Sequence, residues 1–248
     1  MNAETPKAAE LNLPQAFLLL ATKDKDGKPE VPVYALRTTL AGAILAELDL
    51  IGAIGLQGKR VRATGTAPQT DFQRELELIR GKSRPHTPKR WVSMLEGRAE
   101  VQRVYEGMAS LGIVEHVGEK HLGRFRAVRY PEKDHAPEAA ILQKIQAALS
   151  GEPWEPAKPD AKAPDAGASD ATAPDAKTHA PAKSDSKAPD ARTTALIALL
   201  QAAGLFGKFF PAADRVRADE LAKDYWPSRA VEDELRLIRL AEEEAPTL

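Results

Sequence analysis

Two clusters of basic residues are the features of this sequence that could most directly bind a ligand. The first consists of Arg80, Lys82, Arg84, Lys89 and Arg90 and ends at Trp91. The second consists of Arg98, Arg103, Lys120, Arg124, Arg126 and Arg129. Local clusters of this kind bind phosphate groups, whether on lipid headgroups or on nucleic acids. The alternative interpretation for each cluster is solvent-exposed charge that has no ligand.

The second cluster includes a segment that is typical of a strand. Its alternation over residues 124–130 predicts that Arg124 and Arg126 share one face and that Phe125 lies on the other. With the helix that should precede it, this basic hairpin predicts a site for an anionic headgroup, with an apolar residue available for shallow insertion. A helix followed by a basic hairpin also resembles a winged-helix wing, which would imply binding to DNA.

Bulk charge argues against the DNA alternative. The 248 residues include 35 lysines and arginines and 36 aspartates and glutamates, a formal net charge of −1. Because non-specific affinity for nucleic acid comes from excess positive charge, we expect no nucleic-acid partner. The sequence contains no cysteine, which excludes disulfides and thiolate chemistry and fits a cytoplasmic protein.

No arrangement of side chains typical of an enzyme is found in the sequence. Motifs of the Gly-x-Ser-x-Gly and His-Glu-x-x-His types are absent, and Gly55 to Lys59 lacks the spacing of a P-loop. His116, Glu119 and His121 could converge on the second predicted hairpin, but no further ligand follows at a defined spacing. We therefore expect a non-enzymatic protein with no catalytic residue, no metal and no cofactor.

The elements that position these residues are mostly helices. The most informative stretch is 40–56, a nearly all-round apolar helix followed by a glycine and a short strand, which is typical of a central helix. Glu47 and Asp49 lie inside it, and its apolar part is too short to span a membrane. The predicted fold class is mainly α: a helical bundle with amphipathic outer helices and two short β-hairpins. The other predicted helices cover residues 13–21, 72–79, 91–96, 99–111, 136–148, 192–203, 213–222 and 228–244, and the hairpins pair 53–56 with 60–63 and 113–117 with 125–130.

Composition divides the chain into one domain and an insert. Residues 155–191 consist almost entirely of Ala, Pro, Asp and Lys, a composition that predicts a disordered linker. Residues 1–10 carry three charges and no apolar stretch, so we expect a flexible tail and no signal peptide. We predict that residues 11–154 and 192–248 pack as one domain, because apolar helices flank the insert on both sides.

Six segments, in order, resemble the Golgi phosphoprotein 3 family. They are Leu11-Asn-Leu-Pro-Gln-Ala-Phe-Leu-Leu-Leu20 with Lys25-Asp-Gly27, the run 40–56, Ala67-Pro-Gln-Thr-Asp71, Trp91-Val-Ser-Met-Leu95, Gly112-Ile-Val114 with Arg129-Tyr-Pro131, and Thr194-Ala-Leu-Ile-Ala-Leu-Leu200. The resemblance covers nearly all of the chain except the tail and the insert. It implies a peripheral membrane protein that binds phosphatidylinositol 4-phosphate. The composition of the insert suggests a bacterial member.

The resemblance also implies partners. Eukaryotic members hold glycosyltransferases by their cytoplasmic tails at the Golgi, and they use the hairpin, here about 113–130, for self-association and membrane contact. We therefore expect an adaptor for an anionic phospholipid, cytoplasmic or peripheral on the cytoplasmic membrane face, with Arg124, Phe125 and Arg126 on the contacting hairpin. The alternative is a cytosolic protein–protein scaffold that has lost lipid binding.

The resemblance places the family's lipid pocket on four positions of this chain. A tryptophan and an arginine of the family fall at Pro32 and Ala41, and two further arginines fall at Arg98 and Val101. Of the four, this chain retains only Arg98.

Three nearby side chains can take the place of the missing ones. Arg37 lies one helical turn before Ala41, Arg103 lies near Val101, and Tyr34 lies near Pro32. The predicted lipid-binding residues are therefore Arg98, Arg103, Arg37 and Tyr34.

Overall fold

The prediction of a mainly α fold is confirmed by the computed structural model, which describes residues 11–65, 68–118, 120–121, 124–125, 128–151, 190–212 and 215–244. Within these ranges the chain forms ten helices and two antiparallel two-stranded hairpins. The helices are α1 Leu13–Leu20, α2 Val33–Leu50, α3 Gln73–Arg80, α4 Pro88–Leu95, α5 Arg98–Ser110, α6 Ala136–Ser150, α7 Ala191–Ala202, α8 Phe206–Phe209, α9 Arg215–Ala222 and α10 Trp226–Glu244. No helix in the described ranges is both long and apolar enough to cross a membrane.

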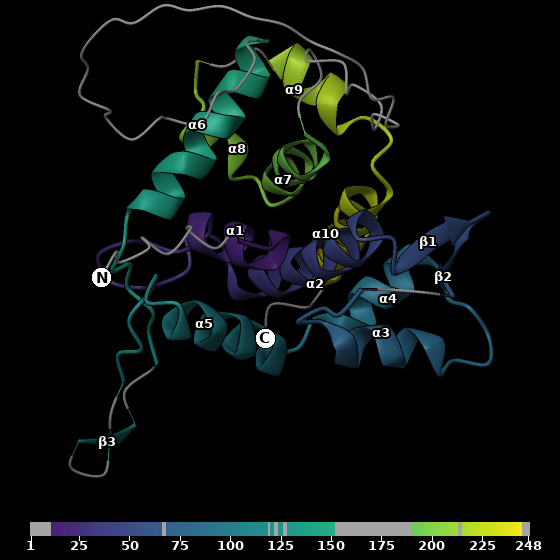
Figure 1. Cartoon of the computed structure of the whole chain (residues 1–248), viewed down its shortest axis with the longest axis horizontal. Coiled ribbons are helices and arrows are strands. Elements are labelled where there is room, and N and C mark those ends of the chain that lie inside the picture. Colours follow the sequence, from purple (N-terminus) through teal and green to yellow (C-terminus); the bar gives the residue numbers. More distant parts are fainter. Residues whose placement is uncertain are drawn as a thin grey trace, which may run out of the picture.

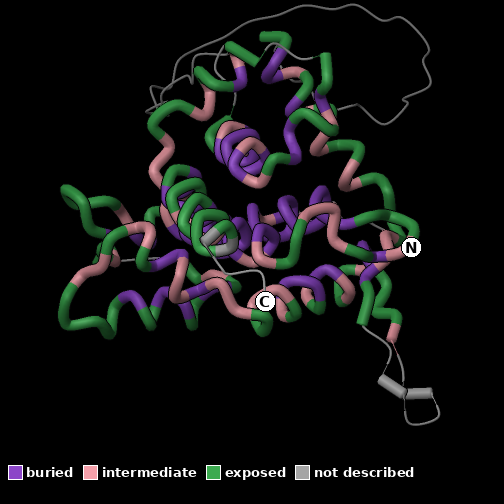
Figure 2. The backbone as a smooth tube through the Cα atoms, turned by 180° about the vertical axis from the view of Figure 1, so that it is seen from behind, coloured by how far each residue is buried: buried purple, intermediate pink, exposed green. Residues whose placement is uncertain are grey.

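Three apolar helices, α1, α2 and α7, form the centre of the bundle (Figure 1). Every residue of α1 is buried, and so are eight of the twelve residues of α7. Helices that are apolar on all sides must lie inside a soluble fold, because no face can be left in water. Figure 2 shows this arrangement as a buried centre surrounded by exposed outer helices.

The central helix begins earlier than the sequence predicts. It starts at Val33 rather than at residue 40, with Pro32 as its N-cap residue. The additional turns contain Thr38 and Thr39, which interrupt the apolar pattern yet are fully buried. The hydroxyl of Thr38 donates to a carboxylate oxygen of Glu96 at 2.8 Å, so a tertiary contact stabilises a helical turn that the apolar spacing does not predict.

The chain before residue 152 and the chain after residue 189 share one hydrophobic core. α6 packs against α7, and Ile145 and Leu149 of α6 belong to the same buried cluster as Leu196 of α7. A buried ion pair adds to this packing, because the Arg192 guanidinium contacts both carboxylate oxygens of Glu47 in α2. Glu47 also accepts a hydrogen bond from the backbone N–H of Leu13 at 2.8 Å, so it connects α1, α2 and α7.

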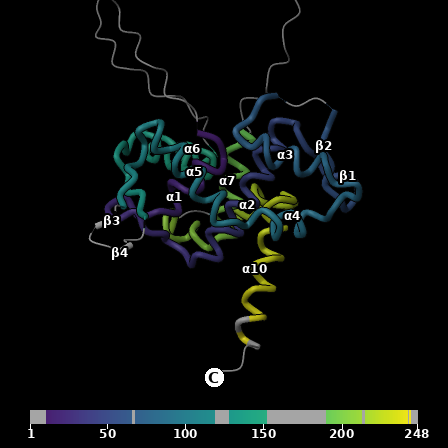
Figure 3. Tube along the Cα trace, turned by 90° about the horizontal axis from the view of Figure 1, so that it is seen from below, coloured from purple at the N-terminus to yellow at the C-terminus, as the bar shows by residue number. Residues whose placement is uncertain are grey.

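The last helix, α10, covers α2 and α4 with its first half. Its buried residues include the apolar Ala230, Val231 and Leu235. Gly42 of α2 allows the close approach, since a Cβ at that position would lie 2.1 Å from a methyl carbon of Val231. Figure 3 shows the far end of α10 extending away from the body of the molecule.

The first hairpin pairs β1 Ile54–Gln57 with β2 Arg60–Ala63, within one residue of the predicted strands. The second pairs β3 Lys120–His121 with β4 Arg124–Phe125 and projects from the body (Figure 1). The predicted strands 113–117 and 125–130 are wrong in extent, because nearer the body only isolated bridges connect Val117 with Arg129 and Val114 with Glu132.

The structure describes the tip of the second hairpin only in part. Arg126 lies outside the described residues, and for Arg124 and Phe125 the structure describes only the backbone. The prediction that Arg124 and Arg126 share one face, with Phe125 on the other, therefore stays a prediction.

Candidate functional site

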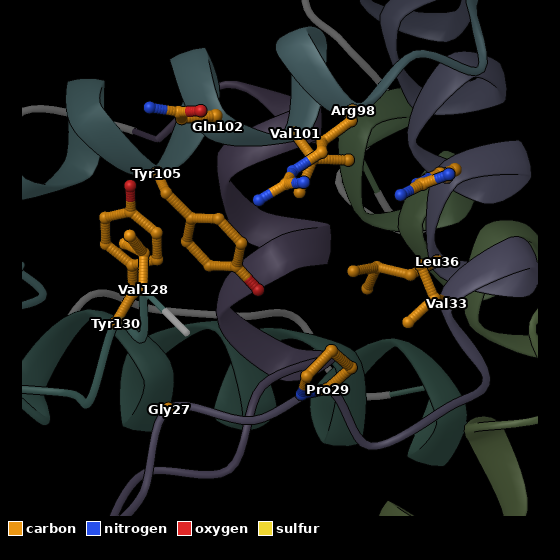
Figure 4. Close-up of a pocket in the computed structure, with 11 residues that line it drawn as sticks. Gly27, Pro29, Val33, Leu36, Arg98, Val101, Gln102, Tyr105, Val128 and Tyr130 are labelled. Carbon is orange, nitrogen blue, oxygen red and sulfur yellow. The ribbon is translucent and has the colours of Figure 1, made fainter. Parts of the chain in front are cut away.

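A surface cavity of about 260 Å³ lies where the body meets the second hairpin. Four segments line it: the turn after α1, the first turns of α2, one face of α5 and residues 128–130 on the returning side of the second hairpin. Its lining residues are Gly27, Pro29, Val33, Leu36, Arg37, Arg98, Val101, Gln102, Tyr105, Val128 and Tyr130. Figure 4 shows the two tyrosine rings on one side of this space and Val33 with Leu36 on the other.

Helical spacing explains why one face of α5 contributes so many lining residues. Arg98, Val101, Gln102 and Tyr105 follow the i, i+3, i+4, i+7 rule, which places them along a single face of the helix. Val33, Leu36 and Arg37 repeat the same spacing over the start of α2. Each helix therefore contributes one guanidinium together with apolar side chains.

Two stacked tyrosines form the rigid wall of the cavity. The rings of Tyr105 and Tyr130 are nearly parallel, with centroids 4.4 Å apart. The hydroxyl of Tyr105 shares a hydrogen bond of 2.6 Å with the hydroxyl of Thr22, and burial raises the pKa of Tyr105 to about 12. Burial also raises the pKa of Tyr130, so both phenols are neutral at physiological pH and the wall carries no charge.

Gly27 brings the turn after α1 against the base of the hairpin. It adopts a φ of +62°, and a Cβ there would lie 2.4 Å from the backbone nitrogen of Tyr130. Only glycine accepts both this conformation and this close backbone approach. The distance between the turn and the hairpin, which defines one end of the cavity, is therefore set by the absence of a side chain at residue 27.

The charged side chains among the described lining residues are the two arginines, and neither has a carboxylate within 4 Å in the described parts of the chain. Arg98 is exposed and Arg37 is half-buried. Glu96 is the acid that interacts with Arg37 over a longer distance; burial raises the pKa of its carboxyl, while the hydrogen bond from Thr38 and the charge of Arg37 lower it.

Another acid close to the cavity is neutralised by a different cation. Glu30 follows the lining residue Pro29 directly, and its carboxylate pairs with the ammonium of Lys208 at 2.6 Å. Arg37 and Arg98 therefore keep donors that can be directed to a bound anion. A planar guanidinium matches the oxygens of a phosphate group well, and two around one cavity can bind one such group together.

The structure brings two of the four predicted lipid-binding residues to the cavity and places the other two elsewhere. Arg37 and Arg98 line it together. Arg103 turns to α3, where it pairs with the buried Glu75 carboxylate, donates to the backbone oxygen of Asp71 at 3.1 Å and lies over the ring of Phe72. Tyr34 is half-buried and packs against the core.

The two family positions at which this chain lacks an arginine differ in their surroundings. Ala41 is completely buried within α2, so that position does not reach the cavity. Val101 lies on the cavity wall beside Arg98. Arg37, one turn before Ala41, supplies the second guanidinium.

Sequence reasoning missed the tyrosine wall and the role of Gly27. Tyr105 and Tyr130 are distant in sequence, and only the return of the hairpin onto α5 stacks their rings. The spacing of Tyr105 seven residues after Arg98 was an available signal, because it predicts the same helix face. Gly27 was recognisable as a turn residue, but its contact with Tyr130 was not.

Comparison with known proteins gives one finding. The family model described as Golgi phosphoprotein 3 (GPP34) matches residues 13–238. None of the curated proteins gives a match. The matched range contains every residue that lines the cavity.

Proposed function

Because the chain belongs to the Golgi phosphoprotein 3 (GPP34) family, we propose that it is a non-enzymatic adaptor that binds the phosphorylated headgroup of an anionic lipid at the cytoplasmic face of a membrane. The headgroup that the family resemblance suggests is phosphatidylinositol 4-phosphate. The observation that carries the proposal is the pair of arginines, Arg37 and Arg98, on one surface cavity with no carboxylate partner among the described residues.

The chemistry of the cavity supports a phosphate ligand rather than an apolar one. A guanidinium presents several N–H donors in a fixed plane and binds phosphate oxygens through two parallel hydrogen bonds. The neutral walls formed by Tyr105, Val101 and Leu36 lower the local polarity, which strengthens the attraction between an arginine and an anion. A headgroup phosphate placed between Arg37 and Arg98 would meet positive charge from two helices.

The mouth of the cavity supports approach to a membrane. Val33 and Val128 line the cavity and are about half exposed, and Val117 on the same hairpin is exposed to a similar extent. Apolar side chains beside a headgroup site can enter the interfacial layer of a bilayer while the arginines bind the lipid. Arg124, Phe125 and Arg126 on the hairpin would extend this contact, and the same hairpin is our candidate for self-association.

Liposome co-sedimentation tests the proposal. We expect the protein to pellet with phosphatidylcholine vesicles that contain phosphatidylinositol 4-phosphate and to stay in the supernatant with phosphatidylcholine alone. Arg98→Ala and Arg37→Ala should each weaken binding about tenfold, the loss expected for one charge-assisted contact. Arg74→Ala removes the same charge from an exposed position on α3 outside the cavity and is the matched control.

A charge-conserving variant separates specific recognition from general attraction to an acidic surface. Arg98→Lys keeps the positive charge but loses the planar fork of donors. Specific headgroup binding predicts a loss with Arg98→Lys, whereas general attraction predicts none. Equal binding to both vesicle types, or full binding by Arg98→Ala, would contradict the proposal and favour the protein–protein scaffold.

Self-association has a separate test. Shortening the hairpin across residues 119–126 should lower the sedimentation coefficient in analytical ultracentrifugation if this segment joins two copies. An unchanged coefficient would remove the hairpin as the self-association element and would leave the lipid proposal intact.

A further inference from the structure

A second group of titratable side chains gathers at the base of the hairpin, apart from the two arginines. Asp24 lies in the turn after α1, Glu132 forms an isolated bridge with Val114 at the base of the hairpin, and His135 precedes α6. Each offers one ligand atom, and the three atoms lie within 4.8 Å of one another. We propose that Asp24, Glu132 and His135 form a binding site for a divalent cation of the zinc class.

Backbone hydrogen bonds hold the three segments together without help from these side chains. The N–H of Glu132 donates to the backbone oxygen of Asp24 at 2.9 Å, which fixes the turn against the strand. The N–H groups of Lys133 and Asp134 both donate to the backbone oxygen of Ile113, at 2.8 and 3.1 Å. The potential ligands are therefore attached to a preformed frame, which lowers the entropic cost of binding an ion.

The carboxylate of Glu132 gives the independent indication of a ligand. Its side chain is only 3% exposed, and one oxygen contacts Nδ1 of His135. The other oxygen, Oε1, is buried and receives no hydrogen bond from an N–H or hydroxyl group of the described residues. An unsatisfied buried carboxylate oxygen is costly and rare, so it indicates that this carboxylate has a partner of another kind.

Glu138, in the first turn of α6, limits which partners the Glu132 carboxylate can have. Its carboxyl interacts directly with that of Glu132, so a third carboxyl group joins those of Asp24 and Glu132. Two carboxyl groups in contact need either a shared proton or a cation between them. A proton held between Glu132 and Glu138 is the rival occupant that the experiment must exclude.

The mixture of donors favours zinc over the harder cations. Calcium and magnesium are bound by oxygen ligands, whereas an imidazole combined with carboxylates is typical of Zn²⁺. The ring of His135 is 70% exposed, so an ion can reach it from solvent, while the buried Glu132 supplies the fixed side of the site.

A bound ion would connect the turn, the hairpin base and the start of α6 through side chains. Glu132 lies two residues after Tyr130, whose ring lines the cavity. Occupancy would therefore stabilise the segment that positions the tyrosine wall. This proposal does not depend on a lipid ligand and can be tested without one.

Isothermal titration of the full-length protein with zinc chloride, in a buffer that does not chelate zinc, tests the site directly. We expect one Zn²⁺ per chain, and affinity at least tenfold lower for His135→Ala and for Glu132→Gln, as is usual when a ligand is lost. His116→Ala removes another exposed histidine of the same hairpin that lies outside the cluster and should bind zinc as the wild type does.

A thermal melt keeps the test decisive if Glu132→Gln folds poorly. Zinc should raise the melting temperature of the wild type but not that of His135→Ala, whose exposed side chain can be removed without disturbing the core. No zinc uptake by the wild type would identify the shared proton as the occupant and overturn the proposal. Zinc binding that persists in both variants, or calcium binding in place of zinc, would overturn it as well.

Discussion

Arginines in the core and arginines at the cavity differ in what neutralises their charge. In the core, Arg192 pairs with Glu47 and Arg103 pairs with Glu75, and both carboxylates are almost completely buried. Removing a carboxylate from water is costly unless a cation and hydrogen bonds replace the water. These two arginines are therefore parts of the folded structure.

At the cavity the fold supplies the cations, and no carboxylate of the described residues pairs with them. Arg37 and Arg98 have no carboxylate within 4 Å among the described residues. The number of arginines near a position therefore does not identify a ligand site. Arg103 and Arg98 lie on one helix, but the fold supplies a counter-charge only for Arg103 among the described residues.

The largest loss of stability should follow from removing the ion pair between Glu47 of α2 and Arg192 of α7. Arg192→Ala leaves the buried Glu47 carboxylate with the backbone N–H of Leu13 as its remaining strong partner. We expect a loss of about 3 kcal/mol in the free energy of unfolding, measured by urea denaturation. A loss below about 1 kcal/mol would show that the N–H of Leu13 and solvent satisfy Glu47 without the arginine.

Removing the second core ion pair, between Arg103 and Glu75, should cost less stability. Arg103→Ala removes the partner of Glu75, and both arginines are about one third exposed, but Arg103 contacts one oxygen of Glu75 whereas Arg192 contacts both oxygens of Glu47. We expect a loss of about 2 kcal/mol in the same urea assay. Liposome binding should be unchanged after correction for the folded fraction, and a specific loss of binding would instead place Arg103 in the lipid site.

Asp49 is a partly buried carboxylate that pairs with no arginine among the described residues. Asp49 accepts a hydrogen bond from the indole N–H of Trp226 at 3.2 Å, and burial raises the pKa of its carboxyl. Because that pKa is higher in the folded state, the stability that Asp49 contributes is present at low pH and lost as pH rises through the folded pKa.

Asp49→Asn keeps an oxygen for the indole and removes the charge. We expect it to stabilise the protein by about 0.5 kcal/mol at pH 7 and to have no such advantage below pH 4. Urea denaturation at the two pH values measures the difference. A variant that is less stable at pH 7 would show that the charged form of Asp49 contributes to folding.

The smallest effect on stability should come from the cavity arginines. Arg37→Ala and Arg98→Ala remove no ion pair in the described structure, so the free energy of unfolding should change by less than about 0.5 kcal/mol. The same variants should show the loss of vesicle binding described above. A large loss of stability would mean that these arginines belong with the core pairs, and the comparison would fail.

The sequence predicted most elements because apolar spacing and glycine or proline mark them. The apolar runs of α1 and α7 and the turn between β1 and β2 lie within one residue of their predicted limits. The start of α2 was missed because Thr38 and Thr39 interrupt the apolar pattern, and what buries them is contact with other segments. Local patterns do not contain that information.

The site was predictable only in part, for a similar reason. Arg98 was identified through the family resemblance, and Arg37 through its position one turn before Ala41. The turn at Gly27, the stacking of Tyr130 on Tyr105 and the diversion of Arg103 to Glu75 each depend on residues that are far apart in the chain. Spacing along one helix indicates a shared face but not what covers it.

The packing of α7 against α1 and α2 has a consequence for folding during synthesis. Arg192 and Glu47 are separated by 145 residues, so the two early helices have no partner for part of their apolar surface until α7 leaves the ribosome. At translation speeds of about 5–20 residues per second, that delay is roughly seven to thirty seconds. The nascent chain must remain soluble through this interval, and it is then, rather than in the finished protein, that we expect the greatest need for chaperones.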